Sequence, residues 1–266
     1  MYQFNYHKPA DVSEAVALYR EADDPMYLSG GMTLIPTMKQ RLASPTDLID
    51  LSGIANMTGI TCDSSKVRVG AFTRHNEVAQ SREILATLPV LGLLAGLIGD
   101  NQVRNRGTIG GSVANSDPSA DYPAAVVGLG ATVHTQDRSI DGDAFFQDLF
   151  ETALQPGEII THIDFPVPTR AAYRKFPNPA SRYAVVGVLV ADFDGAIRVG
   201  VTGAGPCAFR ANALEEVLND SLSVESINGV DVPDAGFNSD LHASAEYRAH
   251  LVKVMARRAV GDLLAT

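Results

Sequence analysis

The sequence predicts a mixed α+β protein in which helices and strands alternate along most of the chain. Asp11 followed by Glu14 is a capping-box pattern, which marks the start of an early helix. Two runs rich in β-branched residues, 183–193 and 196–202, flank Asp194-Gly195 and predict an antiparallel hairpin. A final run at 243–264 has the pattern of one long helix.

Before the hairpin, short apolar runs separated by polar turns predict alternating elements. We expect strands at 4–7, 26–28, 48–51, 67–71, 132–135 and 159–165. We expect helices at 11–19, 33–42, 77–81, 84–98 and 123–129. The run at 84–98 is apolar on most faces, which predicts a buried helix, and a polar, glycine-rich segment follows it at 99–121.

The proline-rich stretch 166–179 is the best candidate for a domain boundary. Beyond the hairpin we expect a helix at 211–218 and a polar loop at 219–241. The chain is therefore expected to consist of residues 1–170 and a smaller C-terminal part, 171–266.

Composition excludes several classes of function. The 266 residues are 45% hydrophobic, which is enough for a real core, and 31 acidic residues outnumber 21 basic ones, which argues against a nucleic-acid partner. The most apolar run, 88–98, is too short for a membrane span, and no signal peptide is visible, so we expect a cytoplasmic protein. Two distant cysteines and unpaired histidines provide neither an iron–sulfur cluster nor a metal site.

Two glycine-rich loops are the strongest candidates for a binding site. The first, 28–34, places Gly30 and Gly31 between a strand and a helix, where exposed N–H groups suit a phosphate or pyrophosphate. The second, 105–115, packs three glycines with small polar residues, and is followed by Asp117 and Asp121. A carboxylate would repel phosphate, so these acids suit ribose, ribityl or adenine groups. The alternative is an ordinary tight turn and a polar surface loop.

Neither loop matches a standard nucleotide motif. The sequence contains neither GxGxxG nor GxxxxGK[ST], so a doubly wound nicotinamide fold has no support. Residues 110–114, GGSVA, imitate the GxSxG nucleophile elbow but fail at the last position, which disfavours a serine hydrolase.

Together the loops resemble a known family. Residues 28–36, LSGGMTLIP, and 102–118, QVRNRGTIGGSVANSDP, with Asp121, are similar to two segments of the FAD subunits in the xanthine dehydrogenase family. Taken as a whole, the sequence is most similar in character to the medium subunits of aerobic carbon-monoxide dehydrogenase and its relatives, which are molybdenum hydroxylases. Weaker matches are the GEII segment at 157–160 and the C-terminal helix with 246–248 and 257–259. The resemblance covers nearly the whole chain.

The resemblance implies an FAD-binding fold of two α/β subdomains, about 1–55 and 56–170, followed by a small α+β domain with an antiparallel sheet. It places the pyrophosphate against Ser29, Gly30, Gly31, Met32 and Thr33. It implies a second wall around the diphosphate and ribityl chain, made of Thr108, Ile109, Gly110, Gly111 and Ser112.

The resemblance also implies roles for five residues outside these walls. Asp121 would accept hydrogen bonds from the nucleotide, while Ile98 and Ile160 would pack on the cofactor, although plain core packing is the alternative for both. Lys175 would contact the polar edge of the flavin or be a solvated surface lysine. Tyr183 would lie near the flavin ring or only begin a strand.

Three residues depart from the family pattern. Ser112 stands where asparagine is common, Met32 replaces a polar residue, and Arg182 replaces an acidic one. These differences put details of the flavin environment in doubt, and not the cofactor.

The resemblance implies an electron-transfer oxidoreductase subunit without a catalytic side chain. A large subunit would hold the molybdenum-pterin cofactor, and a small subunit would hold two [2Fe–2S] clusters that pass electrons to FAD in this chain and on to an external acceptor. The expected assembly is a dimer of heterotrimers. A stand-alone FAD-dependent oxidoreductase and a scaffold that has lost FAD are the alternatives.

Overall fold

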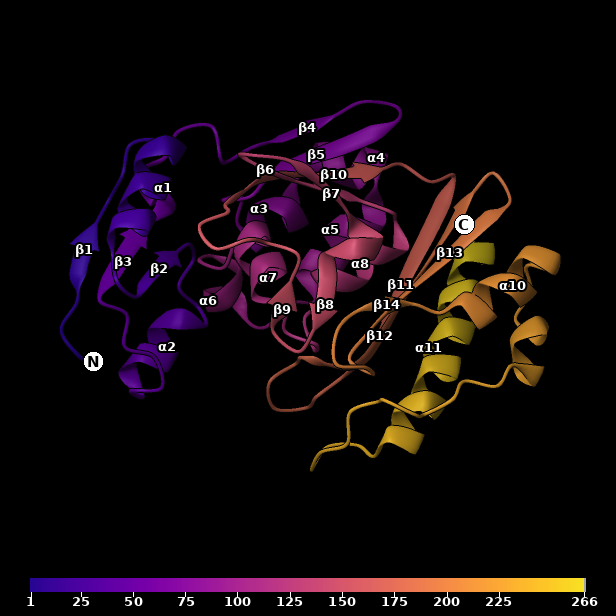
Figure 1. Cartoon of the computed structure of the whole chain (residues 1–266). Helices are drawn as coiled ribbons and strands as arrows, with labels where there is room; N and C mark the ends of the chain where they lie inside the picture. The colour runs from indigo at the N-terminus through magenta and orange to yellow at the C-terminus, as the bar shows by residue number, and fades with distance from the viewer. Residues whose placement is uncertain (266) are drawn as a thin grey trace.

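The computed structural model describes residues 1–265 and confirms the predicted α+β class (Figure 1). Three larger sheets follow one another along the chain, of three, five and four strands. In Figure 1 they lie in the same order across the molecule, from the N-terminal unit to the C-terminal helix. No helix within residues 1–265 combines the length and the apolar character that a bilayer crossing requires.

The N-terminal unit is a parallel sheet with the strand order β1-β3-β2, formed by β1 (Asn5–His7), β3 (Asp47–Asp50) and β2 (Pro25–Leu28). Helix α1 (Val12–Glu21) begins at Asp11, whose carboxylate accepts a hydrogen bond from the N–H of Glu14 at 2.8 Å. The predicted helix start is therefore confirmed. Helix α2 (Leu34–Lys39) is shorter than expected, and a 3-10 turn (Leu51–Gly53) ends the unit.

The middle unit is an antiparallel sheet backed by helices. Its strands, in spatial order, are β4 (Ile60–Cys62), β5 (Lys66–Gly70), β10 (Ile160–Pro166), β6 (Thr132–Thr135) and β7 (Ser139–Asp141). Figure 1 shows the helices gathered on one side of this sheet: α3 (His75–Gln80), α4 (Arg82–Thr87), α5 (Pro89–Gly96), α6 (Asn101–Arg104), α7 (Ile109–Asn115) and α8 (Tyr122–Gly128). A turn of helix, α9 (Gly142–Phe145), and a small hairpin, β8 (Phe146–Asp148) and β9 (Glu151–Thr152), complete the unit.

Two expectations for this unit were wrong. The helix expected at 84–98 is split into α4 and α5 at Leu88, whose backbone (φ −141°, ψ 65°) is not helical because Pro89 disfavours a helical residue before it. The loop expected at 105–115 is helical from Ile109 onward, where α7 forms, and α6 forms just before it. Asp100 and Thr108 cap these helices by accepting bonds from the N–H groups of Val103 and Gly111.

The C-terminal sheet has the order β11 (Arg170–Pro177), β12 (Ala184–Phe193), β13 (Ala196–Thr202) and β14 (Phe209–Arg210), all antiparallel. The predicted hairpin is confirmed at Asp194 and Gly195, which both have positive φ. Helix α11 (Ala245–Ala265) covers one face, beside α10 (Asn212–Asp220) and a 3-10 turn (Glu225–Gly229). The expected boundary stretch contains β11, and the division at residue 170 stays a prediction.

Candidate functional site

The first glycine loop connects β2 to α2. Gly31 has a φ of +73°, a left-handed conformation that favours glycine. The backbone N–H groups of Gly30, Gly31, Met32 and Thr33 form no hydrogen bond within residues 1–265. They are therefore available to a ligand with acceptor oxygens.

The second glycine loop is tied to a segment that follows β5. The N–H of Ile109 donates to Thr73 O at 3.0 Å, and the N–H of Gly110 donates to Ala71 O at 2.8 Å. These two amides are thus already engaged and cannot serve an anion. A Cβ at Gly110 would lie 2.6 Å from the Cβ of Ala71, so only glycine permits this close approach.

The two loops meet although they are far apart in the sequence. The hydroxyls of Ser29 and Thr108 are hydrogen-bonded at 2.7 Å. A Cβ at Gly30 would lie only 2.3 Å from Arg106 O, so the backbones of the loops are in direct contact there. The loops form adjoining walls of one cavity with a volume of about 1000 Å³.

Most of the residues expected to bind a cofactor border this cavity. They are Ser29, Gly30, Gly31, Met32, Thr33, Ile98, Thr108, Gly110, Gly111, Ser112, Asp121, Ile160 and Tyr183. Two expected residues are not on the wall. Ile109 is fully buried in the core, and Lys175 lies behind Asp121.

Asp121 is a buried carboxylate held from behind by two side chains. Tyr173 donates its hydroxyl to Asp121 Oδ1 at 2.6 Å, and Lys175 donates to Oδ2 at 2.9 Å. Lys175 Nζ also donates to Leu97 O at 3.0 Å. Burial raises the pKa of Asp121, although Lys175 opposes this shift. Lys175 therefore orients Asp121 here, and one of its three N–H groups has no partner among these contacts.

A short loop from the C-terminal unit borders the mouth of the cavity. Tyr183 is 46% exposed there, and Arg182 has a φ of +62°, which is unusual for a residue with a side chain. Asn178 fixes the loop through backbone bonds to Tyr183 at 2.7 Å and to Arg182 at 2.9 Å. Burial raises the pKa of the Tyr183 hydroxyl, so it remains protonated.

The wall suits a dinucleotide with an aromatic ring. Free amides gather on the first loop and hydroxyls on both loops, while apolar side chains from Ile98, Leu154 and Ile160 border the cavity elsewhere. The volume is at the upper end of the usual range for small-molecule sites. The carboxylate of Asp121 is held by its cationic and hydroxyl partners, which suits hydrogen bonds from hydroxyl or amide groups.

Sequence reasoning missed wall residues that tertiary contacts bring in. Glu158 borders the cavity within the GEII segment, and it accepts two bonds from Arg138 at 2.8 and 2.9 Å. These bonds lower its pKa to about 2. His75, at the start of α3, also borders the cavity, and nothing in its local sequence marks it as a site residue.

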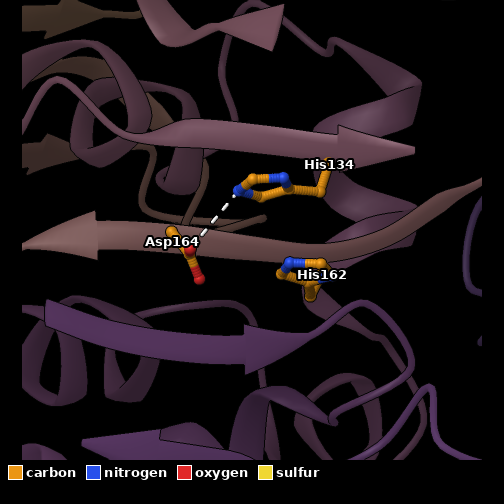
Figure 2. A group of neighbouring side chains, drawn as sticks. All are labelled: His134, His162 and Asp164. Carbon is orange, nitrogen blue, oxygen red and sulfur yellow. Dashed lines mark ion pairs between the residues drawn. The ribbon is translucent and has the colours of Figure 1, made fainter. Parts of the chain in front are cut away.

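His134, His162 and Asp164 form a separate group in which metal-ligand atoms lie within 4.8 Å of one another (Figure 2). The two imidazole rings stack with centroids 4.2 Å apart and planes 9° apart, so their nitrogen lone pairs do not converge on a single point. The carboxylate is already paired with Arg68 Nε at 2.7 Å and Lys66 Nζ at 3.1 Å. A cation would have to compete with both positive charges, so this group is better described as an ion-pair network on the sheet.

Comparison with known proteins gives concordant results. Residues 2–168 match the family described as the FAD binding domain in molybdopterin dehydrogenase. The carbon monoxide dehydrogenase medium chain of Afipia carboxidovorans is 34% identical, over 97% of this chain and 95% of its own length. The nicotine 6-hydroxylase medium subunit of Paenarthrobacter nicotinovorans is 32% identical, over 96% and 95%. In the structure of reconstituted CO dehydrogenase from Oligotropha carboxidovorans, a 34% identical chain superposes with a TM-score of 0.91, covering 99% of this chain and 98% of that one.

Proposed function

Because the chain belongs to the family of FAD-binding domains in molybdopterin dehydrogenases, we propose that it is the electron-transfer flavoprotein subunit of a heteromeric molybdenum hydroxylase. Its relatives are dehydrogenase and hydroxylase subunits, and the chain is accordingly part of an oxidoreductase. Electrons would reach its FAD from [2Fe–2S] clusters in a small partner subunit. A large partner subunit would hold the molybdenum-pterin cofactor, and an external acceptor would take the electrons away.

The contact between Ser29 and Thr108 is the observation that carries this proposal. It brings the two glycine loops together at 2.7 Å, beside a cavity that offers unengaged backbone amides on one wall and apolar side chains on another. Such a wall fits a pyrophosphate joined to an isoalloxazine ring. Lone tight turns would not need both loops to face the same cavity.

The side chains of this chain bind and shield, and none need act as an acid or base. The first loop would hold the pyrophosphate through backbone N–H groups, and Thr33 would add its hydroxyl. Ile98 and Ile160 would exclude water from the ring, while Asp121 would accept hydrogen bonds from the nucleotide. When bound, FAD supplies the redox chemistry, accepting and releasing one or two electrons.

The proposal is tested by purifying the chain with the proteins that accompany it and recording the visible absorption spectrum. We expect flavin bands, release of free FAD on heating, and additional iron–sulfur absorbance from a small partner. A complex that is colourless and cannot be reconstituted with FAD would contradict the flavoprotein assignment. A yellow monomer that oxidises a substrate without partners would favour the stand-alone oxidoreductase.

A further inference from the structure

His75 is a buried residue of the cavity wall that the proposed function leaves without a role. The residue is only 4% exposed, yet it borders the cavity. Its ring packs against that of Tyr122, with centroids 5.3 Å apart, and its backbone N–H donates to Gly107 O at 3.0 Å. The imidazole is therefore fixed directly behind the second glycine loop.

The two ring nitrogens of His75 have different surroundings. Nδ1 is sealed from solvent and has no hydrogen-bond partner within residues 1–265. Nε2 lies against Gly107, where a Cβ would be only 2.6 Å away, and the backbone of Gly107 borders the cavity. Buried donors without a partner are rarer than buried acceptors without one, so the ring proton belongs on Nε2.

The imidazole is neutral at physiological pH. Burial, and next the positive charge of Arg104, lower the pKa of His75 to about 4. A neutral ring with its proton on Nε2 is a fixed hydrogen-bond donor. Gly107 lets the loop backbone lie close to that donor, since any larger residue would collide with the ring.

We propose that the Nε2–H of His75 donates a hydrogen bond to the cofactor bound in this cavity and so positions it. The inference rests on the proposed function, because it takes FAD as the ligand. Along the chain, Gly107 lies between Val103 and the expected wall at Thr108, and all three border the cavity, so we take the acceptor to be a ribityl hydroxyl or the polar edge of the flavin. His75 would be a positioning residue, and it would not transfer a proton.

Three substitutions in the intact complex separate this role from simple packing. His75→Gln places an amide N–H close to the position of Nε2, whereas His75→Asn places one close to the sealed Nδ1. His75→Phe keeps a ring against Tyr122 but removes both nitrogens. Each complex is stripped of flavin, and its affinity for FAD is measured by quenching of flavin fluorescence. Thermal unfolding of the stripped protein gives the second readout.

We expect His75→Phe and His75→Asn to weaken FAD binding about three- to tenfold, the usual effect of one lost hydrogen bond. His75→Gln should restore most of the affinity. His75→Phe should leave the unfolding temperature of the stripped protein unchanged or raised, because it removes an unpaired buried nitrogen. Wild-type FAD affinity in His75→Phe, or equal losses of FAD affinity in all three variants, would overturn the role of His75 and leave the proposed function intact. A wild-type complex that takes up no FAD would overturn the proposed function as well.

Discussion

At the residue scale, position 30 must be glycine because the backbone of Arg106, far away in the sequence, lies against it. Its missing side chain allows Arg106 O to approach the position that a Cβ would occupy to 2.3 Å. We predict that Gly30→Ala forces the loops apart and weakens FAD binding about five- to hundredfold, since overpacking of this kind costs about 1–3 kcal/mol. Flavin fluorescence quenching measures the change.

Gly96→Ala is the matched control for Gly30→Ala. A Cβ at Gly96 would meet only the Cβ of Ala79, at 4.0 Å, which is ordinary contact. This variant should bind FAD as the wild type does. Unchanged affinity in Gly30→Ala would show that the loops separate without cost, and would argue against a site that needs their contact.

Glu158 gives a pH dependence whose sign follows from its partners. Hydrogen bonds from Arg138 hold its pKa at about 2, below the usual value of about 4.3 in an unfolded chain. Its contribution to stability is therefore complete above about pH 4.5 and is lost as the pH falls toward 2. Glu158→Gln should lower the free energy of unfolding by about 1–2 kcal/mol at pH 7, an amount discounted because Arg138 is 44% exposed.

Denaturant titrations of the two proteins at several pH values test this prediction. The deficit of Glu158→Gln should shrink toward zero as the pH approaches 2. Glu216→Gln, which changes an exposed carboxylate on α10, should match the wild type throughout. A deficit of constant size at every pH would mean that glutamine perturbs packing and that the ion pair contributes little.

Residues of the site could be found from the sequence where they belong to a local pattern. Gly30, Gly31 and Thr108 lie in two glycine-rich loops that could be either ligand sites or ordinary turns, and the resemblance of the two loops to a known family favours a ligand; the structure places them on one cavity. His75 could not be found in this way, because its position depends on the pairing of residues 71–75 with 107–110. The place of Lys175 behind Asp121 also depends on packing between distant segments.

At the element scale, helix α8 and strand β13 are joined by two glycines. A Cβ at Gly200 would lie 2.3 Å from Ala124 O and 2.6 Å from the N of Gly128, so the helix backbone rests on the strand. We predict that Gly200→Ala lowers the free energy of unfolding by about 2–3 kcal/mol, because neither backbone can move without disturbing a buried layer. Gly229→Ala, with no atom within 4 Å of its added Cβ, should change stability little. Chemical denaturation of both variants measures the difference. Equal free energies of unfolding for Gly200→Ala and Gly229→Ala would contradict the tight contact between α8 and β13.

Elements with a strong local signal were predictable, while those that depend on context were not. The hairpin around Asp194-Gly195 and the strand at Thr132–Thr135 follow from residue type and alternation. Strand β11 was hidden, because the prolines at both ends of 166–179 indicate a linker when the neighbouring strand β12 is unknown. The break at Leu88 could have been predicted from Pro89, but the apolar residues that continue through it favoured a single helix.

At the scale of the whole molecule, strand β12 belongs to two cores at once. Leu189 and Ala191 are part of the core that contains the middle helices, whereas Val188 and Val190 belong to the core beneath α11. Alternate side chains of one strand therefore join the units that the sequence divides at residue 170. Figure 1 shows α8 lying against this sheet on the side away from α11.

A fragment of residues 1–170 tests how independent the predicted domain is. Without β12 and β13, the buried face of α8 would be exposed to water, and the mouth of the cavity would lose residues 180–183. We predict that the fragment unfolds more than about 10 °C below the full chain, since a loss of several kcal/mol shifts the midpoint by that amount in a protein of this size. Circular dichroism during heating measures the difference. An equal midpoint would establish residues 1–170 as a domain that is stable alone. Strand β12 would then contribute little to the stability of that domain.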